Sequence, residues 1–500
     1  MKTIIVFVHG WSVTSLDTYG ELPARLQNEG AARGIEIQVK EIFLGKYVSF
    51  RDEVRLNDIS KAFGAAVQER LNDVLKNGDR FVCVTHSTGG PVIRYWWNRY
   101  YKKNTAVCPM SHLIMLAPAN HGSALAQLGK ARLGRIKAWF EDVEPGQGVL
   151  DWLELGSAKA WELNKDWIFS DGSQIDTNGV FPFVLTGQSI DRSLYDNLNS
   201  YTGEPGSDGV VRVTAANLEA RHVKLTQSTT IENNTVLITD TFKDPVLTES
   251  PKTPLRILAK KSHSGMDMGI MKSVKKEITE NDSSVALVEA IFDCIKVRNK
   301  EDYLKVYDKF AKESALVQQE ELVEPASSLF SFKRHFIHDR FSMVIFRVMD
   351  SEGYAASDFD LLLTAGDNDD PNHLPEGFLA DRQRNRLNPE IITYYFNYNI
   401  MTGDTLAISK DDGKIIREKS DGIKKLGLRI IPRPNSGFVR YRECIIKAKE
   451  DLFKKALNPN STTLVEITLH RIVSKNVFSL EDTATKNINF KNTEPDDFIV

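Results

Sequence analysis

The chain begins with short apolar segments that alternate with segments of helical periodicity. Residues 3–8 form an apolar, β-branched run, which is typical of a strand that is buried on both faces. Residues 19–32 follow, with Leu22 and Leu26 on one helical face, and residues 35–44 again have strand character. This order predicts the beginning of an α/β domain with a parallel sheet.

The same alternation continues along the first half of the chain. Further strands are expected at 81–85, 113–117, 181–185, 210–213 and 255–258, with a hairpin at 223–239. Further helices are expected around 63–74, just after Ser87, at 285–297 and at 302–318. Strands separated by helices predict a mostly parallel sheet that is covered by helices on both faces, so the fold class is α/β.

Two changes of pattern suggest how the chain is divided. Residues 124–172 are helical and rich in Leu and Trp, and they contain Trp139, Trp152, Trp161 and Trp167. We interpret 124–172 as a lid-like helical insertion in a catalytic domain at 1–324; an ordinary packed insertion is the alternative. After about residue 325 short β-rich runs dominate, which predicts a β-rich, sandwich-like accessory domain at 325–500.

Composition narrows the classes of function. The chain has 500 residues, more than one core of usual size accommodates. Its 64 Lys and Arg against 67 Asp and Glu give a net charge of −3, which argues against nucleic acid as a partner. The four scattered cysteines are expected to be small core residues. Neither a Sec signal nor a membrane-spanning run is visible, so we expect synthesis in the cytoplasm.

The strongest chemical signal surrounds Ser87. A buried strand leads into Thr85-His86-Ser87-Thr88-Gly89 and then into a helix, the setting of a nucleophile elbow. Strand and helix pass close to each other there, so small residues are required beside the serine. Gly89 meets this requirement, whereas Thr85 stands where glycine is commonest. A plain strand-to-helix turn is the alternative.

Residues at the end of the first strand complete this arrangement. His9, Gly10 and Trp11 follow residues 3–8 directly, where an elbow enzyme places the loop that helps to bind an oxyanion. We expect the backbone N–H groups of Trp11 and Thr88 to form the oxyanion hole. Support of the pocket and its loops is expected from His9, Gly10, His86, Gly89, Asn120 and His121.

The acid and the base are sought after the serine in the chain. Asp208 lies in a polar turn that enters the expected strand at 210–213, and Asp191 is the alternative acid. His263 follows an apolar strand in a loop, the position that a general base requires. His222 opens a β-rich run and is interpreted as a packing or surface residue.

Five motifs occur in the order found in α/β-hydrolase lipases. They are 8–11 (VHGW), 85–90 (THSTGG), 117–123 (APANHGS), 207–211 (SDGVV) and 262–265 (SHSG). The chain resembles the branch that contains bacterial lipases, the lecithin–cholesterol acyltransferases and the PGAP1-like deacylases. This resemblance covers about residues 1–275.

The resemblance implies a serine esterase that acts on lipid, with Ser87, His263 and Asp208 as its triad. We expect a phospholipase, because the Leu- and Trp-rich insertion lies where a lid would be. Neither a metal nor an organic cofactor is needed. The partners expected are a phospholipid, a transiently contacted membrane surface and an immunity or regulatory protein. Export without an N-terminal signal, as in type VI lipase effectors, is one interpretation. Two alternatives stay open: an acyltransferase with a sterol or glycerol acceptor, and a catalytically silent binding protein.

Two groups of residues have side chains of the kind that bind metals. Asp367, Asp369 and Asp370 form an oxygen-rich loop, but the spacing is not that of an EF-hand, and a solvated turn is favoured over calcium binding. His335 and His338 lack a Cys or acidic partner in register. No metal site is therefore expected.

Overall fold

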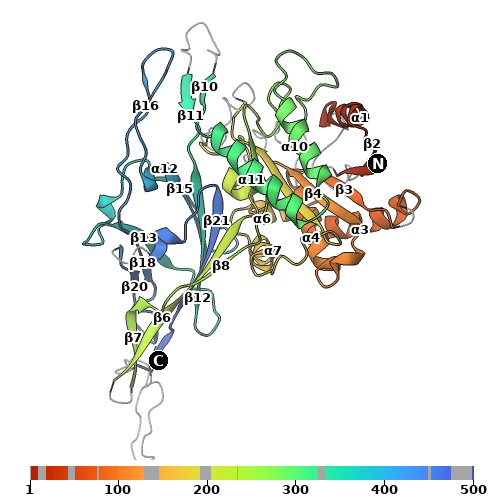
Figure 1. Cartoon of the computed structure of the whole chain (residues 1–500). Coiled ribbons are helices and arrows are strands. Elements are labelled where there is room, and N and C mark those ends of the chain that lie inside the picture. The colour runs from red at the N-terminus through yellow and green to blue at the C-terminus, as the bar shows by residue number, and fades with distance from the viewer. Residues whose placement is uncertain are drawn as a thin grey trace, which may run out of the picture.

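The chain folds into a parallel-sheet part and a β-rich part that lie side by side (Figure 1). The computed structural model describes residues 2–8, 19–42, 51–75, 78–128, 146–191, 204–232, 235–324, 334–448, 452–474 and 498–499. None of the helices within these ranges is both long and apolar enough to cross a membrane.

The parallel-sheet part is built around six strands. In spatial order they are β2 (Glu36–Ile42), β1 (Lys2–Val8), β3 (Phe81–His86), β4 (Met110–Leu116), β5 (Phe181–Gly187) and β9 (Leu255–Leu258). Every neighbouring pair is parallel. The α/β fold class and the predicted parallel sheet are thus confirmed.

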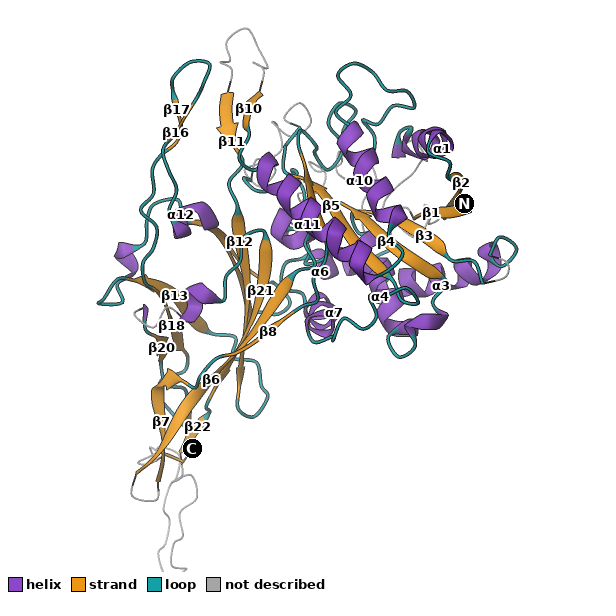
Figure 2. Cartoon of the chain, viewed as in Figure 1, coloured by secondary structure: helices purple, strands orange, loops and turns teal. Residues whose placement is uncertain are grey.

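Helices cover both faces of this sheet. They are α1 (Leu22–Ala32), α3 (Leu56–Leu71), α4 (Gly89–Tyr101), α10 (Val285–Lys296) and α11 (Lys300–Val317), and Figure 2 shows α10 and α11 in front of the strands. On β4, Met115 lies beside Gly90 of α4. His112 has the opposite orientation on the strand and contacts the carbonyl of Val297, just after α10, at 3.0 Å. The two helix layers therefore lie on opposite faces.

The β-rich part is dominated by one wide sheet. Its strands, in order, are β13 (Phe359–Ala365), β18 (Leu426–Pro432), β20 (Cys444–Ile446), β7 (Thr235–Phe242), β6 (Ala220–Glu232), β21 (Ser461–Leu469), β12 (Phe341–Asp350), β15 (Ile391–Asn397) and β14 (Leu379–Arg384), and β8 (Val246–Glu249) also pairs with β6. The predicted hairpin is present as β6 and β7. The division at residue 325 stays a prediction, but this sheet contains strands from both sides of it.

Parallel pairing separates this sheet from a simple antiparallel sandwich. β21 is parallel to both of its neighbours, β6 and β12. The two ends of the sheet nevertheless enclose one apolar cluster, to which β13, β18, β12 and β15 all contribute. The predicted β-rich, sandwich-like region is therefore present, but its pairing is mixed.

β12 lies between two cores. Its side chains alternate between the cluster of the parallel-sheet part, which contains Phe341, Met343 and Ile345, and that of the β-rich part, which contains Val344, Phe346 and Val348. Successive side chains of a strand point to opposite faces, so one strand serves both cores. The two parts are packed together through a shared apolar interior.

Part of the expected insertion at 124–172 is described. It contains η3 (Ala124–Leu128), α6 (Gln147–Leu153) and α7 (Ala158–Ile168), whereas residues 129–145, and with them Trp139, lie outside the described residues. Trp152, Trp161 and Trp167 are buried. The described tryptophans thus contribute to packing, and the lid interpretation stays a prediction.

The remaining elements are short. They are η2 (Thr105–Val107), α9 (Val213–Ala216), β10 (Glu321–Glu324), β11 (Arg334–Ile337), η4 (Pro371–His373), α12 (Tyr398–Thr402), β16 (Ala407–Ile408), β17 (Ile415–Arg417), β19 (Val439–Arg440), α13 (Leu452–Lys455), β22 (Ile472–Ser474) and β23 (Phe498–Ile499). All four cysteines are buried and free, as expected from their scattered positions.

Candidate active site

Ser87 lies in the sharp turn between β3 and α4. Its φ angle is +54°, a conformation that costs a residue with a side chain on the order of 1–3 kcal/mol and is found at functional sites. Gly89 is the buried first residue of α4. A Cβ atom on the neighbouring Gly90 would lie 2.7 Å from Pro118. The close approach expected at an elbow is therefore present, and Gly90 is a contributor that the motif alone did not identify.

The structure brings Ser87, His263 and Asp208 together. The Ser87 Oγ atom lies 3.0 Å from His263 Nε2, and His263 Nδ1 lies 3.0 Å from Asp208 Oδ2. The exposed fractions of the three residues are 9%, 2% and 0%. Asp208, the preferred of the two candidate acids, is therefore the one that contacts the imidazole. Serine, imidazole and carboxylate form a continuous hydrogen-bonded relay.

The turn that carries Asp208 differs from the prediction. Its Oδ1 atom accepts hydrogen bonds from the backbone N–H groups of Val210 at 3.0 Å and Val211 at 2.8 Å. These donors are not available to a strand ladder, and the short helix α9 begins at Val213. The expected strand at 210–213 was wrong for this reason. One carboxylate oxygen fixes the turn, while the other faces the histidine.

A buried arginine, Arg212, stabilises the same turn through ion pairs with two carboxylates. Arg212 donates to Glu204 through Nε at 2.9 Å and Nη2 at 2.6 Å, and it also bonds Asp381 of β14. The Tyr395 ring of β15 lies 4.1 Å from the guanidinium carbon. Burial raises the pKa of Glu204. Burial alone would lower the pKa of Arg212, but Glu204 and Asp381 raise it overall.

None of these supporting residues belongs to a motif that the sequence predicts as part of the site. A charged Arg212 inside the apolar run 210–216 was the only sequence signal, and nothing near Asp381 indicated its partner. The β-rich part thus contributes a carboxylate and an aromatic ring to the support of Asp208.

The His263 loop is held on two sides. Lys261 is fully buried and donates through Nζ to three serine hydroxyls, those of Ser273, Ser283 and Ser284. Burial lowers the pKa of Lys261 to about 8. The Nε2 atom of His86 lies 3.1 Å from the His263 carbonyl oxygen. His86 therefore contacts the loop of the base, in agreement with its expected supporting position.

Asn120 and His121 lie behind the serine turn. Ser87 O accepts from Ala119 N at 3.3 Å, and the fully buried Asn120 donates from Nδ2 to Ala216 O at 2.7 Å. His121 is also buried, and burial, followed by the charge of Arg94, lowers its pKa to about 3. The imidazole is therefore neutral near pH 7. The Asn120 side chain thus joins this loop to α9, whereas neither ring nitrogen of His121 has a hydrogen-bond partner among the described residues.

Other expected site residues are placed as follows. Thr88, the residue after the serine, is buried at the N-cap of α4, whereas His9, Gly10 and Trp11 lie outside the described residues. His222, which was interpreted as a packing or surface residue, is buried in β6 with its ring 5.1 Å from that of Phe169. Within the described ranges, His, Cys, Asp and Glu side chains form no group of three that could hold a metal ion.

The sheet order and the serine turn define the class of protein. The chain has the α/β-hydrolase fold, and it is a serine ester hydrolase. Phospholipase PlaB from Legionella pneumophila shares 42% sequence identity with it over 100% of both chains, with a TM-score of 0.84. The chain belongs to the family of this phospholipase and is a lipid ester hydrolase.

Two further solved structures show likeness. PlaB in complex with thio-NAD shares 42% identity over 97% of each chain, with a TM-score of 0.81. The mature lipase BlEst2 from Bacillus licheniformis shares 18% identity over 43% of this chain and 79% of its own, with a TM-score of 0.32. Neither a protein-family model nor a curated protein matches the sequence.

Proposed function

We propose that the enzyme is a phospholipase in which Ser87 is the nucleophile, His263 the general base and Asp208 the orienting acid. The observation that carries this proposal is the relay of two 3.0 Å contacts from Ser87 Oγ through His263 to Asp208. Such a relay is what acyl transfer to a serine requires. The identity with PlaB over the full length supports a phospholipid as the substrate.

The geometry supports a reaction in two stages. In the first, His263 Nε2 takes the Ser87 hydroxyl proton as Oγ attacks the ester carbonyl, and the same proton then passes to the leaving alcohol oxygen. A lysophospholipid leaves, and the acyl group stays on Ser87. In the second stage, His263 takes a proton from water, the resulting hydroxide attacks the acyl-serine, and the fatty acid departs as Oγ regains its proton.

Charge is stabilised at two points in this mechanism. The oxyanion would accept hydrogen bonds from the backbone N–H groups of Thr88 and Trp11, which is worth about 3–4 kcal/mol for each donor in enzymes of this kind. The Asp208 carboxylate would stabilise the imidazolium that forms at His263. Because Asp208 is fully buried and its turn is fixed by Val210 and Val211, it needs no rearrangement during the reaction.

Binding to a membrane surface during turnover belongs to the same proposal, because the substrate is an aggregated lipid. Export without an N-terminal signal and an immunity or regulatory protein stay predictions. An acyltransferase would use the same acyl-serine, with an alcohol replacing water as the acceptor. The absence of a transfer product when glycerol or a sterol is added would exclude that alternative.

The test compares wild type with Ser87→Ala on liposomes of defined phospholipid, and mass spectrometry identifies fatty acid and lysolipid. We expect at least a 10³-fold loss of fatty-acid release for Ser87→Ala. Ser111→Ala is a matched control, because its hydroxyl bonds the Phe81 carbonyl at 3.2 Å on the neighbouring strand. Equal release by Ser87→Ala and wild type would refute the assignment of the nucleophile.

A further inference from the structure

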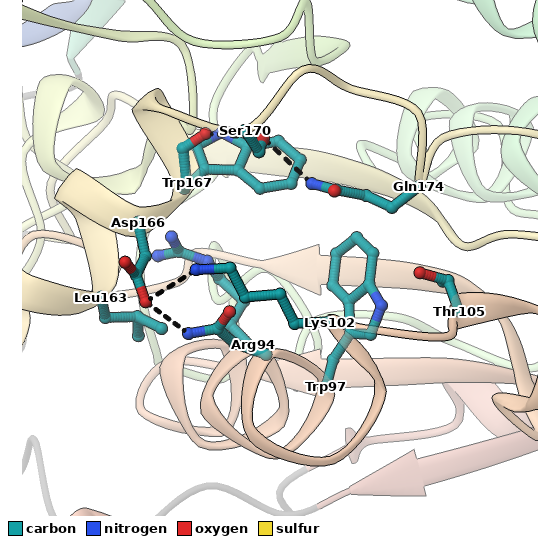
Figure 3. A pocket seen from close by; sticks show the side chains of 10 residues that line it. Arg94, Trp97, Lys102, Thr105, Leu163, Asp166, Trp167, Ser170 and Gln174 are labelled. Atoms are coloured by element: carbon teal, nitrogen blue, oxygen red, sulfur yellow. Dashed lines mark hydrogen bonds and ion pairs between the residues drawn. The ribbon is translucent and has the colours of Figure 1, made fainter.

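A small cavity opens between α4 and α7, outside the relay of Ser87, His263 and Asp208 (Figure 3). Its volume is about 40 Å³. The walls include Arg94, Trp97, Leu163 and Trp167, and polar side chains such as Lys102 and Gln174 complete the lining.

Arg94 is the unusual member of this lining. The residue is only 4% exposed, and its single hydrogen bond within the described chain runs from Nη1 to the neutral Asn120 Oδ1 at 3.2 Å. Among the described residues it forms no ion pair, in contrast to the buried Arg25 and Arg212, each of which has two carboxylate partners. Burial lowers the pKa of Arg94 to about 9.

A buried guanidinium without a carboxylate is energetically unfavourable unless another anion compensates its charge. The one acidic residue in the lining is already engaged, because Asp166 accepts from Lys102 at 3.2 Å and from Asn98 at 3.1 Å. We propose that this cavity binds a small anion, of the size of chloride or a simple carboxylate, on the guanidinium of Arg94.

The dimensions of the cavity restrict the ligand. A water molecule needs about 10–15 Å³ of such space, so a cavity of about 40 Å³ accommodates a small anion with one or two waters. Trp97 and Trp167, whose rings are 5.9 Å apart, form apolar walls. A nucleotide or a phospholipid headgroup is too large to be enclosed in this space.

The site is connected to the serine turn without being part of it. Asn120, the partner of Arg94, also accepts a hydrogen bond from Asn164 of α7 through its carbonyl oxygen at 2.8 Å. The adjacent Ala119 bonds the carbonyl of Ser87. A bound anion would thus stabilise the packing of α4, α7 and the loop behind Ser87. This inference is independent of the proposed function, because it concerns binding rather than ester cleavage.

The solution test measures thermal unfolding while sodium chloride replaces sodium gluconate at constant ionic strength, since gluconate is too large for the cavity. We expect the Tm of wild type to rise by about 1–3 °C and to saturate. Arg94→Gln should lose this dependence. Arg99→Gln, an exposed change on the same helix, should retain it.

A crystallographic measurement keeps the test decisive if Arg94→Gln does not fold. Wild-type crystals soaked in sodium bromide should give an anomalous peak within hydrogen-bonding distance of the Arg94 guanidinium. A Tm that is the same in both salts, a dependence that Arg94→Gln retains, or a cavity without a bromide peak would each overturn the proposal, and water alone would then hydrate Arg94.

Discussion

The contact between Asp381 and Arg212 predicts that a residue of the β-rich part affects catalysis. Asp381→Asn removes the charge and keeps the shape of the side chain. A hydrogen bond between charged groups contributes about 1.5–3 kcal/mol. Glu204 still neutralises Arg212 through two hydrogen bonds, so the loss should stay below the roughly 3–5 kcal/mol for an arginine left without any partner. We therefore expect the free energy of unfolding to fall by about 2 kcal/mol.

The effect on turnover follows from the position of Arg212 four residues after Asp208 on the same turn. A small displacement of the carboxylate impairs the orientation of His263, and misplacements near 1 Å reduce rates by as much as about a hundredfold. We expect kcat to fall by about tenfold or more, with little change in KM. Urea unfolding and lipid-hydrolysis kinetics measure the two quantities, and Asp381→Glu should recover part of kcat.

Glu466→Gln provides a matched control. The side chains of Asp381 and Glu466 are 15% and 19% exposed, and Glu466 also reaches from the β-rich part to a cation, Lys165, at 2.6 Å. It lies on β21, away from the Asp208 turn, so its removal should lower stability without lowering kcat. The reasoning would be refuted by a wild-type kcat in Asp381→Asn, or by the same loss of kcat in both variants.

Three further predictions concern stability. Burial lowers the pKa of His338 from 6.5 to about 4. Because the unfolded chain binds more protons between these two pH values, the free energy of unfolding falls as the pH drops from 6.5 to 4. Urea unfolding should show a smaller fall in this free energy for His338→Gln. A Cβ atom at Gly206, where φ is +76°, would collide with Tyr395 and Phe341, whereas at Gly353, where φ is +87°, the space around it is open. Gly206→Ala should therefore lower the Tm more than Gly353→Ala does, and equal Tm values for the two variants would contradict this. Ser157→Ala removes the hydrogen bond of 3.2 Å that the Ser157 hydroxyl accepts from Ala160 N at the N-cap of α7. Calorimetry should show that the free energy of unfolding falls by about 1 kcal/mol, whereas an unchanged Tm would exclude a capping contribution.

Local patterns were sufficient to predict most of the parallel-sheet part. The apolar runs at β1, β3 and β4 are buried strands, as their composition indicated, and Ser87 lies in the expected turn after β3. Asp208 and His263, selected by chain order and loop position, lie next to each other. These features depend on residues close together in the sequence, or on a chain order that the resemblance supplied.

Features that depend on distant partners were not predictable in this way. The segment 210–213 is apolar and β-branched, yet the Asp208 side chain takes up the N–H groups that a strand would use. The hairpin of β6 and β7 was predicted correctly. The pairing of β6 with β21, more than two hundred residues later, was not, because neither segment contains a sequence pattern that indicates the other. The support of Arg212 by Asp381 is of the same kind, because the sequence shows a charge within an apolar run at Arg212 but does not show which residue pairs with it.

The position of β21 between β6 and β12 has a consequence for the synthesis of the enzyme. Ser87, Asp208 and His263 leave the ribosome long before residues 461–469, yet β6 and β12 each lack a neighbour until that strand arrives. The nascent chain therefore holds all three reactive side chains while the layer that supports the Asp208 turn is still incomplete. Because β21 is among the last strands to be synthesised, the sheet between β6 and β12 closes only when translation is nearly finished.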